Sequence, residues 1–567
     1  MGKLAFVKLN ANPKSAHNTN LTSRRTGVPL VCPCPSPEIG KSPEIGTART
    51  PVLGAIFKLC DRLTGFDIIF LAIIKQRFSW RWAWKSHMNS TITIITFTVF
   101  VVIFLWIGAL AAKFSKNTEA DYLLGDRSFG KLFIGLSAGA TGNSGWIMVG
   151  AVGTAYTIGI SSLLIVLPTF LGELVFWTFF SDKVNRLSVE QDSQTIPEFL
   201  GATVKKPKGK RIITLIVALI TIIFIGAYTS AQFAAAAKTL DVFFGVDPNI
   251  GALIAAASIM VYCVTGGLRA SVWTDVVQAF VVMFVCLGML VVAIVAGGGV
   301  SEILSKLNEI DPNLTNLTAG YNAWTLLALM VGFFFLGLGF DISQPQVLVR
   351  LLAGRSPEET KQARWIYLAY VYSTWTAMVL FGIASRALLA NLDDPEQALP
   401  FYAMQNFPPV LVGIVLAGVF SVIASTADSQ LLVCSSALAR DISPSFHRKM
   451  FRRYGIKYEQ AATFIVGIIA VIVTLMISST VFSLILFASG AVAASIGPAM
   501  FIALLKRRTH HLALSATMLV GLTIAITWNY LGYGSILYEI CPGFLGGLLV
   551  HEVLMRTAFK LPTEGKV

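Results

Sequence analysis

The stretch "GATGNSGWIM", Gly139–Met148, lies in the middle of an apolar run over residues 132–160. It contains three glycines, and each weakens a helix by roughly 1 kcal/mol relative to alanine. Thr141, Asn143 and Ser144 add side chains that form hydrogen bonds. Close packing of helices through small residues is one interpretation. The added polar side chains favour another, a membrane helix that is broken at its centre and exposes backbone carbonyls to a cation.

The composition predicts an all-α membrane protein with many spans. Of the 567 residues, 55% are hydrophobic and 13% charged, and the mean hydropathy is +0.70. Soluble domains carry about 25% charged residues. Apolar runs long enough to cross about 30 Å of hydrocarbon recur between residues 91 and 556, whereas a β-barrel would show alternating segments of about ten residues.

We predict thirteen transmembrane helices from these runs. They cover residues 91–112, 131–158, 162–180, 211–240, 248–266, 270–297, 322–350, 364–390, 408–438, 459–478, 480–505, 511–531 and 535–555. Loops after odd-numbered spans are basic, as in "KKPKGKR" (205–211), "RLLAGRSPEETKQAR" (350–364) and "HRKMFRR" (447–453). Loops after even-numbered spans are short or acidic, as in "NLDDPEQ" (391–397). Because basic loops stay in the cytoplasm, this alternation predicts a cytoplasmic C-terminus and places residue 88 outside.

Residues 1–87 form a basic N-terminal extension with 13 Lys/Arg and 4 Asp/Glu. A basic segment beside the first span is expected inside, against the orientation that the other loops give. We therefore favour Met88 as the natural start and residues 1–87 as a mis-assigned start; the alternative is a disordered extension. The predicted organisation is this extension, a membrane domain at 88–556 and a short cytoplasmic tail at 557–567.

Several function classes find no support in the chain. The net charge of +14 comes from Lys and Arg in short loops and in the extension, so it does not indicate nucleic-acid binding. The seven cysteines form no framework, and neither an H-E-x-x-H nor a G-x-x-x-x-G-K-[ST] motif is present. We predict that the chain is not an enzyme and holds no transition metal.

A second break is predicted in the seventh span, "GFFFLGLGFDISQPQVLVR" (332–350). Three glycines precede Asp341, and Pro345 removes a backbone donor and disrupts the preceding turn. Discontinuous helices in corresponding places of two halves indicate a transporter binding site. Since the two broken spans are five apart, we predict a five-plus-five inverted repeat of spans 2–6 and 7–11.

Polar residues also gather in the ninth span, "AGVFSVIASTADSQLLVCSS" (417–436). Ser421, Ser425 and Asp428 follow one helical face. Together with Thr426 and Ser429 they favour an all-oxygen site for an alkali cation, although a single serine would more often bond back to the carbonyl four residues earlier. In the sixth span, Asp275 is interpreted either as a cation or proton relay on the inward path, or as a structural group that pairs with Arg269 or lies at the membrane interface.

The segments "DYLLGDRSFGKLFIGLSAGATGNSGW" (121–146), "TGGLRASVWTDVVQAF" (265–280) and "ASTADSQLLVCSSAL" (424–438) resemble the sodium/solute symporter family, and most closely its sodium/proline symporter branch. The resemblance covers residues 88–556. It implies a LeuT-like fold and sodium-driven uptake of a small solute by alternating access. It also implies a sodium site made of the carbonyls of Ala140, Asn143 and Val422 and the hydroxyls of Ser425 and Thr426, with a second cation or an exit path at Asp275, Asp428 and Ser429.

The resemblance places the solute among Gly142, Ser144, Trp146, Tyr228, Gly337, Phe340 and Gln344. Two positions depart from the branch, which reads "GASDMSGW" where this chain has "GATGNSGW" and carries a tryptophan before the Gln-Pro pair of span 7. Gly142 thus stands where the branch has an acid. Proline or a related amino acid is the expected solute, with a small carboxylic acid, proton coupling or a transporter-like sensor as alternatives. The expected partners are sodium, the solute and the lipid bilayer, in a bacterial inner membrane.

Overall fold

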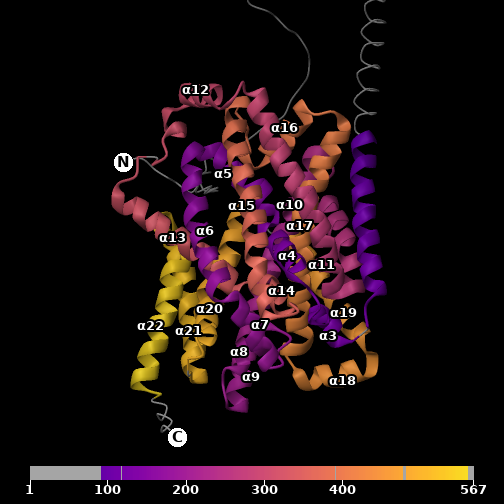
Figure 1. Ribbon diagram of the computed structural model, residues 1–567, viewed down its shortest axis with the longest axis vertical. Coiled ribbons are helices and arrows are strands. Elements are labelled where there is room, and N and C mark those ends of the chain that lie inside the picture. The colour runs from indigo at the N-terminus through magenta and orange to yellow at the C-terminus, as the bar shows by residue number, and fades with distance from the viewer. Residues whose placement is uncertain are drawn as a thin grey trace, which may run out of the picture. The chain divides into compact units, whose positions relative to one another are not determined.

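The computed structural model describes residues 91–559, apart from residues 117, 319, 390, 477–480 and 508. The predicted extension at 1–87 and the end of the tail, from residue 560, lie outside the described residues. The described part is helical almost throughout (Figure 1), and its one β-bridge joins Phe129 to Gly354.

The long helices account for nearly all of the apolar runs. In chain order they are Thr91–Lys113, α4 (Lys131–Gly145) with α5 (Ala151–Ile158), α6 (Leu163–Phe179), α9 (Pro207–Ile220) with α10 (Gly226–Phe244), α11 (Pro248–Ala296), α13 (Ala323–Ser343), α15 (Pro357–Leu388), α17 (Pro409–Ser436), α19 (Ile456–Met476), α20 (Val481–Leu504), α21 (His511–Tyr530) and α22 (Ile540–Thr557). Shorter helices connect them: α3 (Glu119–Leu124), α7 (Ser181–Glu190), α8 (Ile196–Ala202), α12 (Val300–Ile310), α14 (Pro345–Leu352), α16 (Ala398–Asn406) and α18 (Pro444–Tyr454).

Ten described stretches are long and apolar enough to cross a membrane. Two of them have 49 residues each, about 74 Å of helix, which is more than twice the hydrocarbon thickness. Each turns at a glycine with a positive φ, Gly159 (65°) and Gly267 (56°). At Gly267 a Cβ would also lie under 3.0 Å from the Tyr122 carbonyl oxygen. Each stretch therefore matches two predicted spans, while the total of thirteen stays a prediction.

Both predicted helix breaks are present. In α4 the break falls at Ser144, whose φ of 52° and ψ of 175° are almost confined to glycine. A π-helical turn, η2 (Trp146–Gly150), follows it. In the seventh span Gln344 has an extended backbone between α13 and α14, and Pro345 begins α14. Helix propensity and proline sterics were sufficient to locate both breaks.

α17 lies at the centre of the helical bundle (Figure 1). It packs against α4, α10, α11 and α19, and its side chains are buried almost without interruption from Val415 to Ser436. The helix Thr91–Lys113 instead exposes most of its apolar side chains. The polar residues of α17 therefore face other helices rather than lipid.

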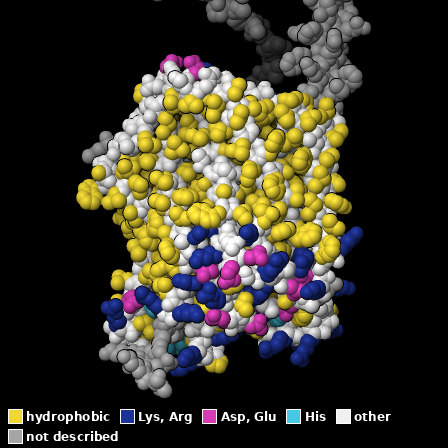
Figure 2. All heavy atoms as spheres, in the orientation of Figure 1, with side chains coloured by type: hydrophobic (Ala, Val, Ile, Leu, Met, Phe, Trp, Pro, Cys, Tyr) yellow, Lys and Arg dark blue, Asp and Glu magenta, His cyan; other side chains and the backbone are white. Residues whose placement is uncertain are grey.

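The surface separates apolar from charged residues. Figure 2 shows a broad hydrophobic band and, at one end, a zone rich in Lys and Arg. In Figure 1 this is the end at which α7, α8, α9 and α18 lie. A band of apolar side chains is favourable only against hydrocarbon, so the described helices form an integral membrane domain.

Glycines bring α6 and α13 unusually close together. A Cβ on Gly337 would lie under 3.0 Å from the Thr169 carbonyl oxygen, and one on Gly172 would lie equally near the Phe334 carbonyl oxygen. Backbone cannot move aside as a flexible side chain can. This close backbone contact holds α6 and α13 in a fixed position relative to each other.

We expect Gly337→Ala to destabilise the protein by more than about 2 kcal/mol, because the added methyl group overpacks the contact between α6 and α13. Thermal unfolding of the detergent-purified protein measures the effect. Gly288→Ala is the matched control, since no atom lies within 4 Å of a Cβ at that position. Equal melting temperatures for the two variants would contradict this account of the contact.

Candidate functional site: an oxygen cluster beside a buried cavity

Oxygen atoms of α4 and α17 meet just before the break in α4. The Ser425 hydroxyl donates to the Ala140 carbonyl oxygen at 3.1 Å and lies 3.3 Å from the Val422 carbonyl oxygen. The Thr426 hydroxyl lies 2.9 Å from the Thr141 carbonyl oxygen and 3.2 Å from that of Val422. Three carbonyls and two hydroxyls thus converge in a place without solvent exposure.

Four of the residues expected to bind sodium take part in this cluster, and their role stays a prediction. Asn143 lies closer to the break, where its side-chain amide donates to Thr374 at 2.9 Å. Thr141 approaches Thr426 in its place. Ser421 bonds back to the Ala417 carbonyl oxygen at 2.6 Å, so it follows the ordinary behaviour of a serine in a helix.

The cluster is suited chemically to a hard monovalent cation. All five atoms are oxygens, which alkali ions prefer over nitrogen or sulfur ligands. The two hydroxyls donate to carbonyls here, and rotation about their C–O bonds would turn lone pairs toward an ion instead. The N–H groups released by the break are satisfied elsewhere: Gly145 donates to the Gln232 side chain at 2.9 Å, and Trp146 to Ser144 Oγ at 3.2 Å.

A second polar cluster lies next to the first. Asp428 Oδ1 accepts hydrogen bonds from Ser271 at 2.9 Å and from Ser429 at 2.8 Å. Ser429 lies 3.1 Å from the Thr141 hydroxyl, which links the two clusters. Asp275 Oδ2 accepts from Ser137 at 2.6 Å. The three residues expected to form a second cation site are therefore neighbours.

Arg350 crosses this second cluster. It is 1% exposed and contacts Asp275 Oδ2 at 3.1 Å, Ser137 at 3.1 Å and Ser271 at 2.7 Å, and it also donates to Ser429. Counting Arg350 among the charges of a basic loop was wrong, because every residue of α14, which follows the break at Gln344, is buried. A basic residue that pairs inside the membrane with an acid on a distant helix cannot be recognised from its neighbours in the sequence.

Pairing of Asp275 with Arg269, one of the two sequence interpretations, was also wrong. Arg269 donates through Nε to Asp121 at 3.1 Å, and Asp275 is fully buried rather than interfacial. Burial by itself raises the pKa of Asp121, but hydrogen bonds from Arg269, Ser115 and the Lys116 backbone outweigh it and hold the pKa below its usual value. Asp121 therefore stays ionised, and its ion pair holds α3 against α11.

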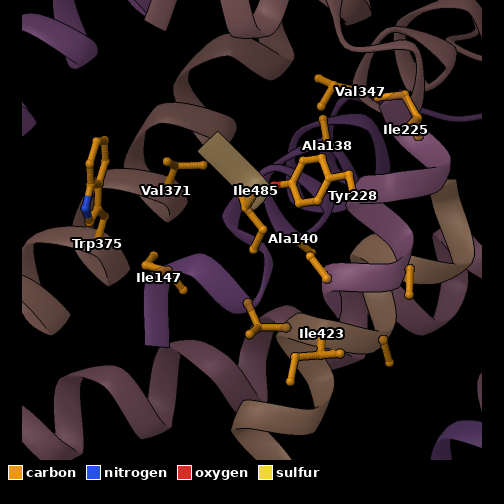
Figure 3. Packing of buried hydrophobic residues seen from close by; sticks show 14 of the residues in the cluster. Ala138, Ala140, Ile147, Ile225, Tyr228, Val347, Val371, Trp375, Ile423 and Ile485 are labelled. Carbon is orange, nitrogen blue, oxygen red and sulfur yellow. The ribbon is translucent and has the colours of Figure 1, made fainter. Parts of the chain in front are cut away.

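A cavity lies beside the break and is lined by residues on both sides of it. Residues of α4, α6, η2, α10, α13, α15 and α20 line it: Gly142, Asn143, Ser144, Trp146, Ile147, Thr169, Glu173, Tyr228, Leu336, Phe340, Tyr367, Val371, Trp375, Ile485, Leu486 and Ser489. Figure 3 shows Val371 and Ile485 between Trp375 on one side and Tyr228 on the other. The broken part of α4 thus borders a largely apolar chamber, one turn or less from the oxygen cluster.

Five of the seven residues expected to bind solute line this cavity: Gly142, Ser144, Trp146, Tyr228 and Phe340. Gly337 faces α6 instead, and the Gln344 side chain donates to the Ser489 carbonyl oxygen at 3.2 Å. The Trp146 and Trp375 rings meet edge to face, with centroids 5.0 Å apart. Glu173 went unnoticed in the sequence, although an acid inside a predicted span is itself a signal of function.

Comparisons with known proteins agree with this architecture. The high-affinity proline transporter PutP of Bacillus subtilis (strain 168) is 29% identical over 455 residues, which cover 78% of this chain and 94% of that protein. The sodium/proline symporter of Escherichia coli (strain K12) is 29% identical over 469 residues, covering 81% and 91%. Both relatives are covered almost completely by the membrane domain.

A solved structure of a Na+-coupled sialic acid symporter, in a substrate-bound outward-open state, superposes with a TM-score of 0.71 at 18% identity. The match covers 84% of this chain and 99% of that one, and it is consistent with the predicted LeuT-like fold. The sequence profile described as "Sodium:solute symporter family" matches residues 122–521. With that match extending over most of its length, the chain belongs to the sodium:solute symporter family.

Proposed function

We propose that this protein is a sodium-coupled secondary active symporter that imports proline or a related amino acid by alternating access. One observation carries the proposal: the hydroxyls of Ser425 and Thr426 contact backbone carbonyls of α4. These carbonyls lie just before the break, whose residues line the cavity. An ion at this point would tie α17 to the first half of the broken helix. Its binding would therefore change the shape of the cavity beside the break.

The names of the relatives and the cavity itself support the choice of solute. Curated relatives that align over nearly their whole length are named proline transporters. Aromatic and aliphatic side chains, among them Trp146, Val371 and Trp375, form most of the cavity wall, which suits a small apolar ring. A small carboxylic acid is the second candidate, because Gly142 removes an acid from this wall.

Sodium entry supplies the driving force for accumulation. One charge moving through 100 mV releases about 2.3 kcal/mol, and each 1.36 kcal/mol corresponds to a tenfold ratio. A single coupled sodium ion thus supports roughly 50-fold accumulation before its own concentration gradient is added. The second cluster, at Asp275, Asp428 and Ser429, is the expected place for a further cation or for the inward exit of the first.

The expected location is a bacterial inner membrane, with the C-terminus in the cytoplasm and residue 88 outside. The zone rich in Lys and Arg at one end of the domain (Figure 2) is the expected cytoplasmic side under the positive-inside rule. The bacterial sources of the proline transporters named above agree with this location.

Uptake of radiolabelled proline into proteoliposomes tests the proposal. At an inside-negative potential of about 100 mV, we expect an inward sodium gradient to raise steady-state proline accumulation at least about tenfold over an equimolar choline gradient at the same pH, because one coupled ion supports roughly 50-fold accumulation. A panel of small carboxylic acids serves as the comparison. Undiminished uptake in choline would exclude sodium coupling, and faster sodium-driven uptake of a carboxylic acid without an amine would exclude proline as the solute.

A further inference from the structure

Two carboxylates lie buried beside the cavity without a basic partner. Glu173, on α6, is 5% exposed and Asp341, on α13, is 0% exposed. Neither forms an ion pair with any described Lys, Arg or His. Glu173 Oε2 and Asp341 Oδ2 receive no hydrogen bond of normal geometry from the described residues. Each acid therefore keeps a free oxygen in a place from which water is largely excluded.

Tyr367 joins the two acids to the cavity wall. Its hydroxyl donates to Asp341 Oδ1 at 2.9 Å and also interacts with Glu173. The same hydroxyl lies 3.4 Å from the position that a Cβ on Gly142 would take. Glu173, Tyr367 and Gly142 all line the cavity. Glu173 thus belongs to the wall of the solute chamber, and Asp341 lies behind that wall, joined to it through Tyr367.

Two ionised carboxylates at this point would need a positive group or a proton beside them. Glu173 and Asp341 are close enough to interact with each other, and two like charges in a low dielectric oppose each other's ionisation. An unpaired buried carboxylate is itself unfavourable by several kcal/mol. A monovalent cationic group beside the free oxygens would relieve both penalties at once.

We propose that Glu173 binds the ammonium group of the solute, and that Asp341, held by Tyr367, positions and reinforces it. This inference rests on the proposed function. The Glu173 carboxylate would then enter the chamber from α6, near Gly142 of α4, the position at which the resembled branch has an acid. It also gives a reason for the tight contact at Gly337, because that glycine lies against the backbone nitrogen of Glu173.

The surroundings favour an organic ammonium over a metal ion. The cavity wall around Glu173 is aromatic, with Trp146, Tyr367 and Trp375, and aromatic faces attract ammonium groups. The cluster at Ser425 and Thr426 instead offers five oxygens and no ring. The oxygen cluster thus suits an alkali ion, whereas the acid and the aromatic rings of the cavity suit a charged nitrogen.

The test compares two ring compounds with the purified protein at saturating sodium. Pyrrolidine carries the ammonium without a carboxylate, and cyclopentanecarboxylate carries the carboxylate without nitrogen. Thermal stabilisation gives the affinity of each without any need for transport. We expect Glu173→Gln to lower the affinity for pyrrolidine and for proline by roughly 10- to 100-fold, the loss expected for a charge-assisted hydrogen bond. The affinity for cyclopentanecarboxylate should stay within twofold.

Two further variants make the result specific. Glu302→Gln removes an acid of α12 whose side chain is 56% exposed, and we expect it to change none of the affinities. Tyr367→Phe keeps the ring that stacks on Trp177 at 4.4 Å but frees Asp341. We expect it to lower the affinity for pyrrolidine several-fold and to leave the affinity for cyclopentanecarboxylate unchanged. This variant tests the subsite even if Glu173→Gln fails to fold.

The outcomes separate this subsite from the proposed function. Absence of sodium-driven proline uptake by the unaltered protein would overturn the proposed function, while the pyrrolidine measurement would still test the subsite. Equal pyrrolidine affinity in the unaltered protein and in Glu173→Gln, or no measurable affinity in either, would overturn the subsite alone. A Glu173→Gln variant that shifts the half-saturating sodium concentration but not the affinity for proline would assign the acids to a coupling ion and would also overturn it.

Discussion

Replacing Thr426 with valine is expected to raise the half-saturating sodium concentration for uptake by roughly 10- to 150-fold. The hydroxyl is one of five oxygens in the cluster between α4 and α17, and it reaches both the Thr141 and the Val422 carbonyl oxygens. An interaction between a polar group and a charge contributes about 1.5–3 kcal/mol, and each 1.4 kcal/mol changes affinity tenfold. Initial rates of proline uptake against sodium concentration, at constant ionic strength and pH, measure the shift.

Ser421→Ala is the control for that experiment, because Ser421 lies on the same helix and bonds back to the Ala417 carbonyl oxygen. We expect its sodium dependence to match that of the unaltered protein. Ser425→Ala should behave like Thr426→Val, since Ser425 reaches the Ala140 carbonyl oxygen. A sodium half-saturation that moves less than threefold in both Thr426→Val and Ser425→Ala would remove this cluster from the sodium site.

Arg350→Gln is expected to cost about 3–5 kcal/mol of stability, the usual effect of removing one partner of a buried ion pair. The guanidinium contacts Asp275 and three serines in the same cluster as Asp428. Without it, two buried carboxylates remain close to each other with no positive charge. The fraction of detergent-solubilised protein that stays monodisperse after heating, followed by size-exclusion chromatography, measures the loss.

A second substitution identifies the cause. Arg350→Gln combined with Asp275→Asn should recover a large part of the stability, because it removes the unpaired charge together with its partner. Arg355→Gln is the matched control: its side chain is 64% exposed, and it pairs at 3.4 Å with Glu359, four residues further along the chain, a contribution below about 1 kcal/mol. Failure of the double variant to recover any stability would contradict a buried ion pair as the reason.

Arg350 also bears on the proposed second cation site. In that proposal, with Asp275 and Asp428 both ionised, Arg350 balances one of the two negative charges. One further cation would balance the other. Asp275 Oδ1 and Asp428 Oδ2 are the oxygens of this cluster without a hydrogen-bond partner among the described residues, and the proposal assigns them as the ligands of that cation.

Local sequence signals predicted the features that depend on neighbours along the chain. The apolar runs predicted the membrane helices, because a helix needs roughly 20 consecutive apolar residues to cross the hydrocarbon core. The glycines around Asn143 and the proline at 345 gave both breaks, because they weaken a helix within one turn. The hydroxyls of Ser425 and Thr426 were recognisable because they are adjacent polar residues in an otherwise apolar span.

Only the tertiary structure decided which distant residues meet. Ser425 and Ala140 are 285 residues apart in the chain. The packing of α4 on α17 places the Thr141 carbonyl, rather than that of Asn143, beside Thr426. The burial of Arg350 and the joining of Glu173 to Asp341 through Tyr367 depend likewise on how separate helices pack. Helix formation is determined by contacts within a few residues, whereas a charge buried in the membrane finds its partner through packing between helices, which no local pattern records.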